Sequence, residues 1–335
     1  MRELATEGRL MEEFEVEEDA TKLEKASPTL VLVYIGLWYL FSIVLSVYNK
    51  WIFSNRGLDF KFPLITTSIH QLIQTVLAYG TLRLFNLRYT HYPLRDLVTK
   101  VAPCALASAG DIGMGNVSLM SVTLSFYTMV KSSALGFVLG FSLLFGLERL
   151  DWSLVLTISV LTGGVLMMVA GETEFDLVGF ILVLSASCAS GLRWALTKVF
   201  LQGGLLKNQA KPHPVQTILL FSPIMFVVLL IWGLIFEGPV KFAQARLWDE
   251  YSVPVGIVLV LIPGVLAYGL TTSEYALLNI TGPLTLAIAG ICKEVATIIV
   301  SVLVFGDKLS LLNGIGLVVT IASIFAYHKL RVSTE

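Results

Sequence analysis

Long apolar stretches joined by short connections make up most of the chain. The hydrocarbon core of a bilayer is about 30 Å thick, so a helix needs about 20 mainly apolar residues to cross it. This pattern predicts an all-α membrane protein with ten transmembrane helices. The ten stretches lie at roughly 29–53, 63–86, 99–120, 123–147, 152–170, 176–200, 215–236, 252–278, 283–306 and 310–329.

The first 26 residues break this pattern. They hold nine acidic and four basic residues and little apolar content, which is typical of a disordered segment. A cleaved signal peptide would start with basic residues and an early apolar core, and this segment has neither. We therefore expect residues 1–26 to form a disordered acidic cytosolic tail, and the first apolar stretch to act as a retained signal anchor.

Composition supports a membrane protein and excludes other classes. Hydrophobic residues make up 56% of the chain and charged residues 14%, with a mean hydropathy of +0.80. Soluble domains carry about 25% charged residues, so this chain has too little charge to cover a soluble surface. With 23 basic and 24 acidic residues, the net charge of −1 also gives no electrostatic case for binding nucleic acid.

The distribution of Lys and Arg predicts the orientation in the membrane. With the N-terminus in the cytosol, fourteen basic residues fall on the cytosolic side and six on the opposite side. Cytosolic loops carry the excess of positive charge, so ten spans place both termini in the cytosol. Three bases belong to neither side because they lie within the spans: Lys131, Arg193 and Lys293.

Two parts of the chain share an order of features. The stretches that begin at Ser125 and at Gly282 each contain an early lysine, a Phe-Gly pair that ends one span, a charged turn and a final span with glycine. They are the fourth and fifth spans of one half and the ninth and tenth of the other. Five spans per half is an odd number, so the two halves enter the membrane in opposite directions.

Such inverted repeats are the plan of many secondary transporters, whose ligand site lies near the midplane between the halves. We therefore expect two inverted five-helix repeats, at residues 27–172 and 173–331, followed by a short C-terminal tail at 332–335.

Lys131 and Lys293 lie about 12 Å and about 15 Å into their spans, one from each half. A charge at the centre of a membrane helix costs about 2.5–3.5 kcal/mol, so each lysine requires a reason to be there. Two such lysines at a shared depth repel each other unless an anion joins them, and a phosphate or diphosphate would be that anion. The alternative is that each lysine pairs with a resident acid, such as Asp111, Glu274 or Glu294.

Four further residues are candidates for substrate binding. Glu294 follows Lys293 directly and either partly neutralises it or lines the cavity. Tyr127 lies four residues before Lys131 on the same helical face, where it stacks on a base or sugar or simply packs. Tyr268 and Tyr275, near the end of the eighth span, leave the same two alternatives open.

The sequence gives no sign of catalysis or of a bound cofactor. Its three cysteines, Cys104, Cys188 and Cys292, have no disulfide or metal-binding spacing. A membrane enzyme would need a nucleophile, a metal cluster or a pair of acids, and no convincing set is present. We expect a protein that is not an enzyme and that uses no cofactor.

At several short motifs the chain resembles the drug/metabolite transporter superfamily, and within it the triose-phosphate translocator and nucleotide-sugar transporter group. The C branch of solute carrier family 35, related to GDP-fucose transporters, is the most similar. The resemblance extends from about Ser42 to about Leu330. The motifs are Tyr48-Asn49-Lys50-Trp51, Asn116-Val117-Ser118-Leu119, Ser125-Phe126-Tyr127 with Lys131, Gly282-Pro283-Leu284-Thr285 with Lys293, and Phe305-Gly306-Asp307.

The resemblance implies a ten-helix exchanger with both termini cytosolic and with phosphate-binding lysines at Lys131 and Lys293. Plastid members have Lys-Arg where this chain has Lys293-Glu294. Their His and Thr in the third span correspond to Ile112 and Gly115, and a ligand-binding Tyr corresponds to Leu270. These departures argue against triose phosphate as the substrate.

Together these features predict an antiporter that carries a nucleotide sugar or phosphorylated sugar across the Golgi or endoplasmic reticulum membrane by alternating access. Its partners would be a phosphate-bearing small molecule and the lipid bilayer, with a homodimer among the assemblies left open. The alternative is a non-transporting regulator of Golgi glycosylation that keeps the transporter fold, which the Glu294 next to Lys293 favours.

Overall fold

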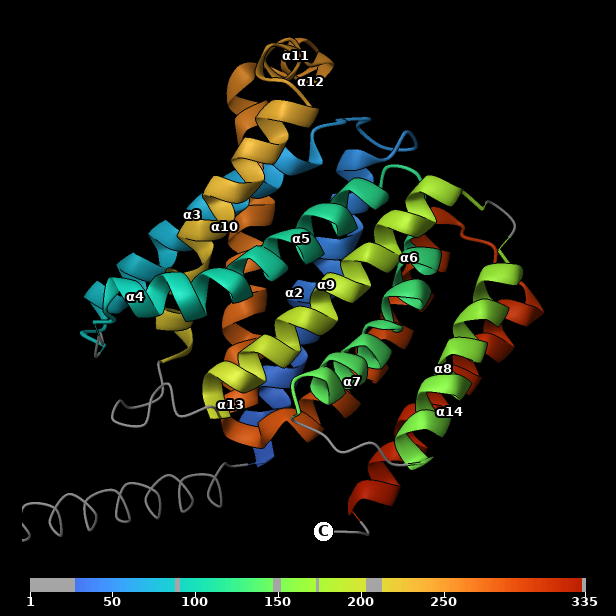
Figure 1. Ribbon diagram of the computed structural model, residues 1–335. Helices are drawn as coiled ribbons and strands as arrows, with labels where there is room; N and C mark the ends of the chain where they lie inside the picture. The colour runs from blue at the N-terminus through green and yellow to red at the C-terminus, as the bar shows by residue number, and fades with distance from the viewer. Residues whose placement is uncertain (1–27, 88–90, 147–151, 173–174, 203–212, 333–335) are drawn as a thin grey trace, which may run out of the picture.

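The computed structural model describes residues 28–87, 91–146, 152–172, 175–202 and 213–332, and every regular element in these ranges is helical (Figure 1). The tail expected at residues 1–26 and residues 333–335 of the C-terminal tail lie outside the described residues. The elements are α2 (Pro28–Phe53), α3 (Pro63–Leu84), α4 (Leu94–Asp96), the π-helix η1 (Leu97–Val101), α5 (Ala102–Ser118), α6 (Leu124–Lys131), α7 (Ala134–Leu144), α8 (Trp152–Ala170), α9 (Leu177–Gln202), α10 (Pro214–Phe236), α11 (Pro239–Ala243), α12 (Arg246–Glu250), α13 (Val253–Phe305) and α14 (Leu311–Val332).

The helices follow the apolar stretches but divide them differently at three places. The third stretch lies on η1 and α5, which continue from α4 without a break, and the fourth is split into α6 and α7 at Ser132 and Ser133. The eighth and ninth stretches, expected as two helices, lie on one helix, α13, of 53 residues.

Helix α13 bends sharply between its two arms. The Tyr48 hydroxyl donates to the carbonyl of Leu259 at 3.1 Å, and the Tyr39 hydroxyl donates to that of Ala289 at 2.5 Å. In a straight helix these carbonyls would be about 45 Å apart, whereas the two tyrosines are only about 14 Å apart along α2. The helix therefore reverses its course, and it turns near the bottom of the view in Figure 1.

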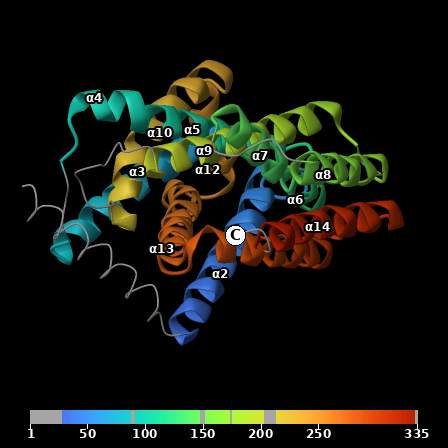
Figure 2. The same cartoon turned by 60° about the horizontal axis from the view of Figure 1, so that its bottom comes forward.

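Four helix pairs make the most extensive packing: α3 with α10, α8 with α14, α2 with α13, and α5 with α9. The view in Figure 2 also shows α8 and α14 side by side at one end of the molecule. These two helices approach closely at Gly164 and Gly316. A Cβ at either glycine would meet the carbonyl oxygen of the other, at 2.9 Å and 2.6 Å. Small residues at such crossings let membrane helices pack backbone to backbone.

Apolar side chains cover the outside of the molecule and polar side chains lie inside it. Leu32, Val76, Leu166, Leu303 and Val318 are each more than 60% exposed, whereas many polar residues are buried, including His70, Gln71, Gln74, Asp111 and Asn116. Five helical segments in the described residues are long and apolar enough to cross a membrane. An apolar exterior is stable in lipid rather than in water, so the chain is a membrane protein.

The residues that carry the family resemblance connect helices. The buried ammonium of Lys50, at the end of α2, donates to the carbonyls of Leu119 and Val122 at 2.9 Å and 2.5 Å, just after α5. The last carbonyls of a helix have no partner within the helix, so Lys50 satisfies that of Leu119, the residue that caps α5, and also bonds the loop after it at Val122. Asp307, after α13, accepts from the backbone N–H of Ser125 in the first turn of α6 at 3.0 Å.

Candidate functional site

A cavity of about 270 Å³ lies among α2, α3, α5, α6 and both arms of α13. Its lining brings together four of the six sequence-predicted site residues: Lys131, Lys293, Tyr127 and Glu294. Asp111 lines it as well. Residues more than 160 positions apart in the chain therefore contribute to one polar cavity inside an apolar protein.

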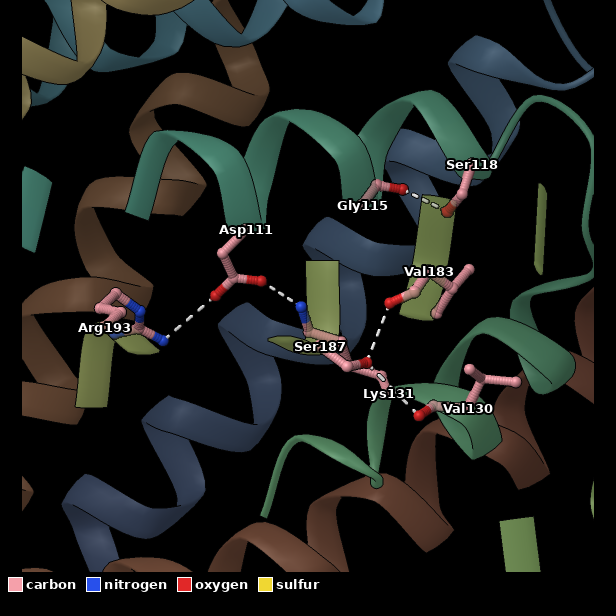
Figure 3. A network of polar contacts seen from close by, with 8 residues as sticks. All are labelled: Asp111, Gly115, Ser118, Val130, Lys131, Val183, Ser187 and Arg193. Carbon is pink, nitrogen blue, oxygen red and sulfur yellow. Dashed lines mark hydrogen bonds and ion pairs between the residues drawn. The ribbon is translucent and has the colours of Figure 1, made fainter. Parts of the chain in front are cut away.

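Lys131 and Asp111 form an ion pair in this cavity (Figure 3). Lys131 is the last residue of α6, and Asp111 lies in the middle of α5 with only 5% of its surface exposed. The second carboxylate oxygen of Asp111 faces Nη2 of Arg193 on α9 at 3.4 Å. Asp111 thus bridges two cations from two different helices. At Lys131 the structure therefore shows the alternative in which the lysine pairs with an acidic residue of the protein itself.

Arg193 lies within a predicted span and is not among the site residues that the sequence predicts. Its guanidinium also lies over the Trp194 ring, 4.7 Å from the ring centroid, while its Nε has no hydrogen-bond partner among the described residues. The sequence singles out Arg193 only as one of three basic residues that lie within the predicted spans. Its partner Asp111 could not be chosen among the candidate acids without the packing of α5 against α9.

Lys293 has a different environment from Lys131. Its ammonium lies 4.6 Å from the centroid of the Trp38 ring on α2, which is a favourable cation–π distance. Glu294, the next residue on α13, also lines the cavity. The Trp38 ring is 4% exposed and packs with Leu277 and Ala289, so α2 holds it firmly beneath the lysine.

Tyr127 lies one helical turn before Lys131, and its hydroxyl fits against Gly115 on α5. A Cβ at position 115 would lie 3.0 Å from that hydroxyl oxygen, so the glycine makes room for the ring. Ile112 and Leu270, two further positions where this chain departs from plastid transporters, line the cavity directly. The departures noted in the sequence are therefore located at the cavity itself.

Tyr268 and Tyr275 lie apart from the four residues above and are not among those that line the cavity. Both pack on a cluster that includes Ala78 and Leu82 of α3 and Ile218 of α10. The Tyr268 hydroxyl is 2.7 Å from Oγ1 of Thr81. In this structure the two tyrosines join α13 to its neighbours, and a role in binding stays a prediction.

Uncharged polar residues also line the cavity. Asn49, Thr67, His70, Gln71 and Gln74 line it from α2 and α3. The amide of Asn116 on α5 donates to Oγ1 of Thr67 at 2.8 Å, and that of Asn49 donates to Oδ1 of Asn116 at 3.4 Å. His70 Nε2 lies 3.0 Å from the carbonyl of Val260, which satisfies one ring nitrogen. The cavity thus combines charged groups with neutral donors and acceptors.

A second cavity, of about 380 Å³, lies at the end of α10 opposite its Pro214 start. Glu237, directly after α10, accepts from the backbone N–H groups of Leu64 and Ile65 at 2.6 Å and 2.9 Å. Burial raises the pKa of this carboxyl to about 7, although the two backbone hydrogen bonds act in the opposite direction. Among the described residues no group of three or more His, Cys, Asp or Glu could hold a metal ion.

The cationic cavity in an all-helical membrane protein agrees with the match of residues 29–328 to the model of the Triose-phosphate Transporter family. The chain belongs to this family. The family and its named members are transporters and not enzymes, which confirms the expectation that this protein is not an enzyme and the resemblance to the triose-phosphate translocator and nucleotide-sugar transporter group.

Three relatives match nearly the whole chain. YMD8 of Saccharomyces cerevisiae, named as a candidate nucleotide-sugar transporter, is 31% identical over 90% of this chain and 85% of its own. A probable sugar phosphate/phosphate translocator of Arabidopsis thaliana is 35% identical over 89% of this chain and 73% of its own. UDP-galactose transporter 1 of Arabidopsis thaliana is 27% identical over 92% and 89%.

A solved crystal structure has the same fold. It superposes with a TM-score of 0.54 over 89% of this chain and 96% of its own, at 13% sequence identity. At that identity the likeness concerns the fold alone.

Proposed function

We propose that this protein is an antiporter that exchanges a nucleotide sugar or a phosphorylated sugar across an endomembrane by alternating access. The observation that carries this proposal is the cavity that contains Lys131 and Lys293 together, with Arg193 next to it. Cations within a bilayer are costly unless they bind an anion, and phosphate groups are the anions that sugar phosphates and nucleotide sugars share. The printed names of the relatives favour the same two substrate classes.

Two inverted five-helix halves, at 27–172 and 173–331, remain our proposal for the architecture. In such a repeat the second span corresponds to the seventh and the fifth to the tenth. The packing of α3 against α10 and of α8 against α14 supports this symmetry. Both α7 and α13 end at a glycine with φ +68°, Gly146 and Gly306, in the left-handed conformation typical of helix ends.

The size of the cavity supports a mechanism in which the halves move. Small-molecule sites usually enclose roughly 300–1,000 Å³. The observed volume of about 270 Å³ lies just below this range, so the cavity must widen to take a whole nucleotide sugar. Rocking of the halves around the cavity would widen it on one side of the membrane and then on the other. The fourteen-to-six distribution of basic residues supports cytosolic termini, and a Golgi or endoplasmic reticulum location agrees with the nucleotide-sugar names of the relatives.

The alternative of a non-transporting regulator of Golgi glycosylation has one structural observation in its favour. Lys131 is already neutralised by Asp111, and Glu294 lies next to Lys293, so neither lysine needs an external anion to be tolerated. A regulator would keep the fold while the cavity stays closed.

Exchange in proteoliposomes tests transport directly. Purified protein is reconstituted with internal UDP-galactose, GDP-fucose, triose phosphate or inorganic phosphate, and uptake of the same radiolabelled compounds is measured. We expect exchange of at least one of them, and we expect Lys131→Ala and Lys293→Ala to abolish it without loss of folded protein. Wild-type exchange by either variant would remove that lysine from the mechanism. If the wild-type protein exchanges none of these compounds and none of them raises its melting temperature, the regulator is favoured.

A further inference from the structure

We propose that Asp111 is a resident counter-anion that compensates the cations of the empty cavity and thereby lets the empty transporter reorient. This proposal rests on the proposed transport function and deepens it. It predicts that exchange is not strictly one for one, because the protein returns without cargo while Asp111 takes the place of the phosphate. In this role Asp111 is a positioning residue that sets how tightly the two directions of transport are coupled.

The position of Asp111 fits this role. Its side chain is buried, and its two carboxylate oxygens face cations on separate helices, Lys131 on α6 and Arg193 on α9 (Figure 3). The Lys131 and Arg193 side chains each keep 19% of their surface exposed. Because Asp111 has two partners, Lys131 can leave it for a phosphate while Arg193 stays. The carboxylate is never left buried without a cation, which is the costly outcome.

The charges around the cavity explain why a counter-anion matters. Three cations, Lys131, Arg193 and Lys293, are balanced by three acids: Asp111, Glu294, and Glu274, whose charge acts on Arg193. Without Asp111 three cations would stand against two acids, and Lys131 would lose its ion-pair partner. Closing the two halves around that excess would be disfavoured until an anion entered, and only the loaded protein would change sides. With Asp111 present, the empty state keeps most of its compensation.

The same contact makes Asp111 a competitor of the substrate. A phosphate monoester carries about −1.5 to −2 charges at neutral pH and can hold Lys131 and Lys293 at the same time. To bind there, it must displace Asp111 from Lys131. We therefore expect removal of the carboxylate to tighten phosphate binding and, at the same time, to tighten coupling.

Asp111→Asn tests coupling because it keeps the size of the side chain and removes its charge. Uptake of radiolabelled inorganic phosphate and UDP-galactose is measured into vesicles preloaded with the same compound and into vesicles that contain none. For the wild-type protein we expect clear uptake into the empty vesicles. For Asp111→Asn we expect the ratio of uptake into empty vesicles to exchange to fall roughly tenfold or more. Asp96→Asn is the matched control, because Asp96 pairs with Lys100 at 2.5 Å outside the cavity.

An unchanged ratio of the two uptake rates in Asp111→Asn would overturn the proposal, as would a wild-type protein that exchanges but never fills empty vesicles. A second measurement does not depend on transport. In detergent, we expect Asp111→Asn to melt at a lower temperature than the wild type and inorganic phosphate to stabilise the variant more than the wild type. The double variant Asp111→Asn/Lys131→Met should regain stability, because it removes the unmatched cation as well.

Equal stabilisation of wild type and variant by phosphate would also overturn the proposal. Failure of the proposed function gives a different pattern. In that case the wild-type protein moves none of the compounds, while the melting temperatures still show whether Asp111 compensates Lys131 and Arg193.

Discussion

Lys131 and Lys293 have the same expected role but different surroundings, and the contrast shows how a membrane protein can hold a cation. Lys131 ends α6 and is paired with the carboxylate of Asp111, which Arg193 shares. Lys293 lies within α13 and rests on the face of the Trp38 ring at 4.6 Å, with Glu294 as its sequence neighbour. Among the described residues no ion pair is found for Lys293.

The difference concerns what each lysine loses when a phosphate arrives. Lys131 must give up an ion pair, whereas Lys293 gives up a cation–π contact worth about 0.5–2 kcal/mol and a longer-range attraction to Glu294. Lys293 is therefore the cation that is more readily available in the empty cavity. We infer that a phosphate meets Lys293 first and that recruitment of Lys131 is the step that Asp111 opposes.

The largest expected difference is in stability. Lys131→Met leaves Asp111 with Arg193 alone, so we expect a loss of about 2 kcal/mol, less than the 3–5 kcal/mol typical of breaking a buried pair completely. Lys293→Met places a thioether on the Trp38 ring, which is itself favourable, so the loss should stay under about 1 kcal/mol. Thermal unfolding in detergent measures both. Lys61→Met is the control, because Lys61 pairs with Asp59 at an exposed site. Equal losses for Lys131→Met and Lys293→Met would contradict the comparison.

A smaller effect should follow from removing the ring beneath Lys293. Trp38→Leu keeps an apolar side chain on α2 but abolishes the cation–π contact, so the orientation of the Lys293 ammonium is lost. We expect the KM for the transported compound to rise about 3- to 10-fold, as a contact of about 1 kcal/mol predicts. Initial rates of uptake over a range of concentrations measure this change.

Trp38→Phe is the companion variant, because it keeps an aromatic face and should restore part of the affinity. A KM that is the same in the Leu variant as in the wild type would show that Trp38 only packs.

The smallest expected effect concerns Glu237, which lies away from both lysines. It changes the stability of the whole protein without changing the difference between Lys131 and Lys293. Burial raises the pKa of Glu237 to about 7 in the folded protein, above its ordinary value of 4.5. The folded state therefore binds the proton more tightly than the unfolded state, so stability falls as the pH rises through this interval and levels off above about pH 7. We expect the melting temperature to fall by roughly 2–4 °C between about pH 5 and about pH 8.

Glu237→Gln should flatten this dependence, since the amide does not titrate. Its transport at neutral pH and the difference between the two lysine variants should stay as in the wild type. A melting curve that keeps its full pH dependence in Glu237→Gln would assign the titration to another group.

Much of the architecture could be read from the chain because the bilayer imposes a length on every apolar helix. The predicted apolar stretches lie on helices, apart from the three differences in how the helices divide them, and Lys131 and Lys293 stand out because a charge in a span is rare. The eighth and ninth stretches were expected as two helices, whereas the chain stays helical through the turn between the two arms of α13. Tyr268 and Tyr275 were chosen as binding residues on type alone, and the packing of α13 against α3 and α10 places them outside the cavity lining.

The sequence alone determined that this is a helical membrane protein with two cations, one from each part of the chain, buried where charge is costly. It could do so because hydrophobicity and charge are properties of single residues. Only the tertiary structure decided which acid compensates which base. Asp111, Glu274 and Glu294 were equivalent candidates from the sequence. The packing of α9 against both α5 and α6 accompanies the placement of Asp111 against Lys131 and Arg193, and an ion pair depends on a distance that no single segment contains.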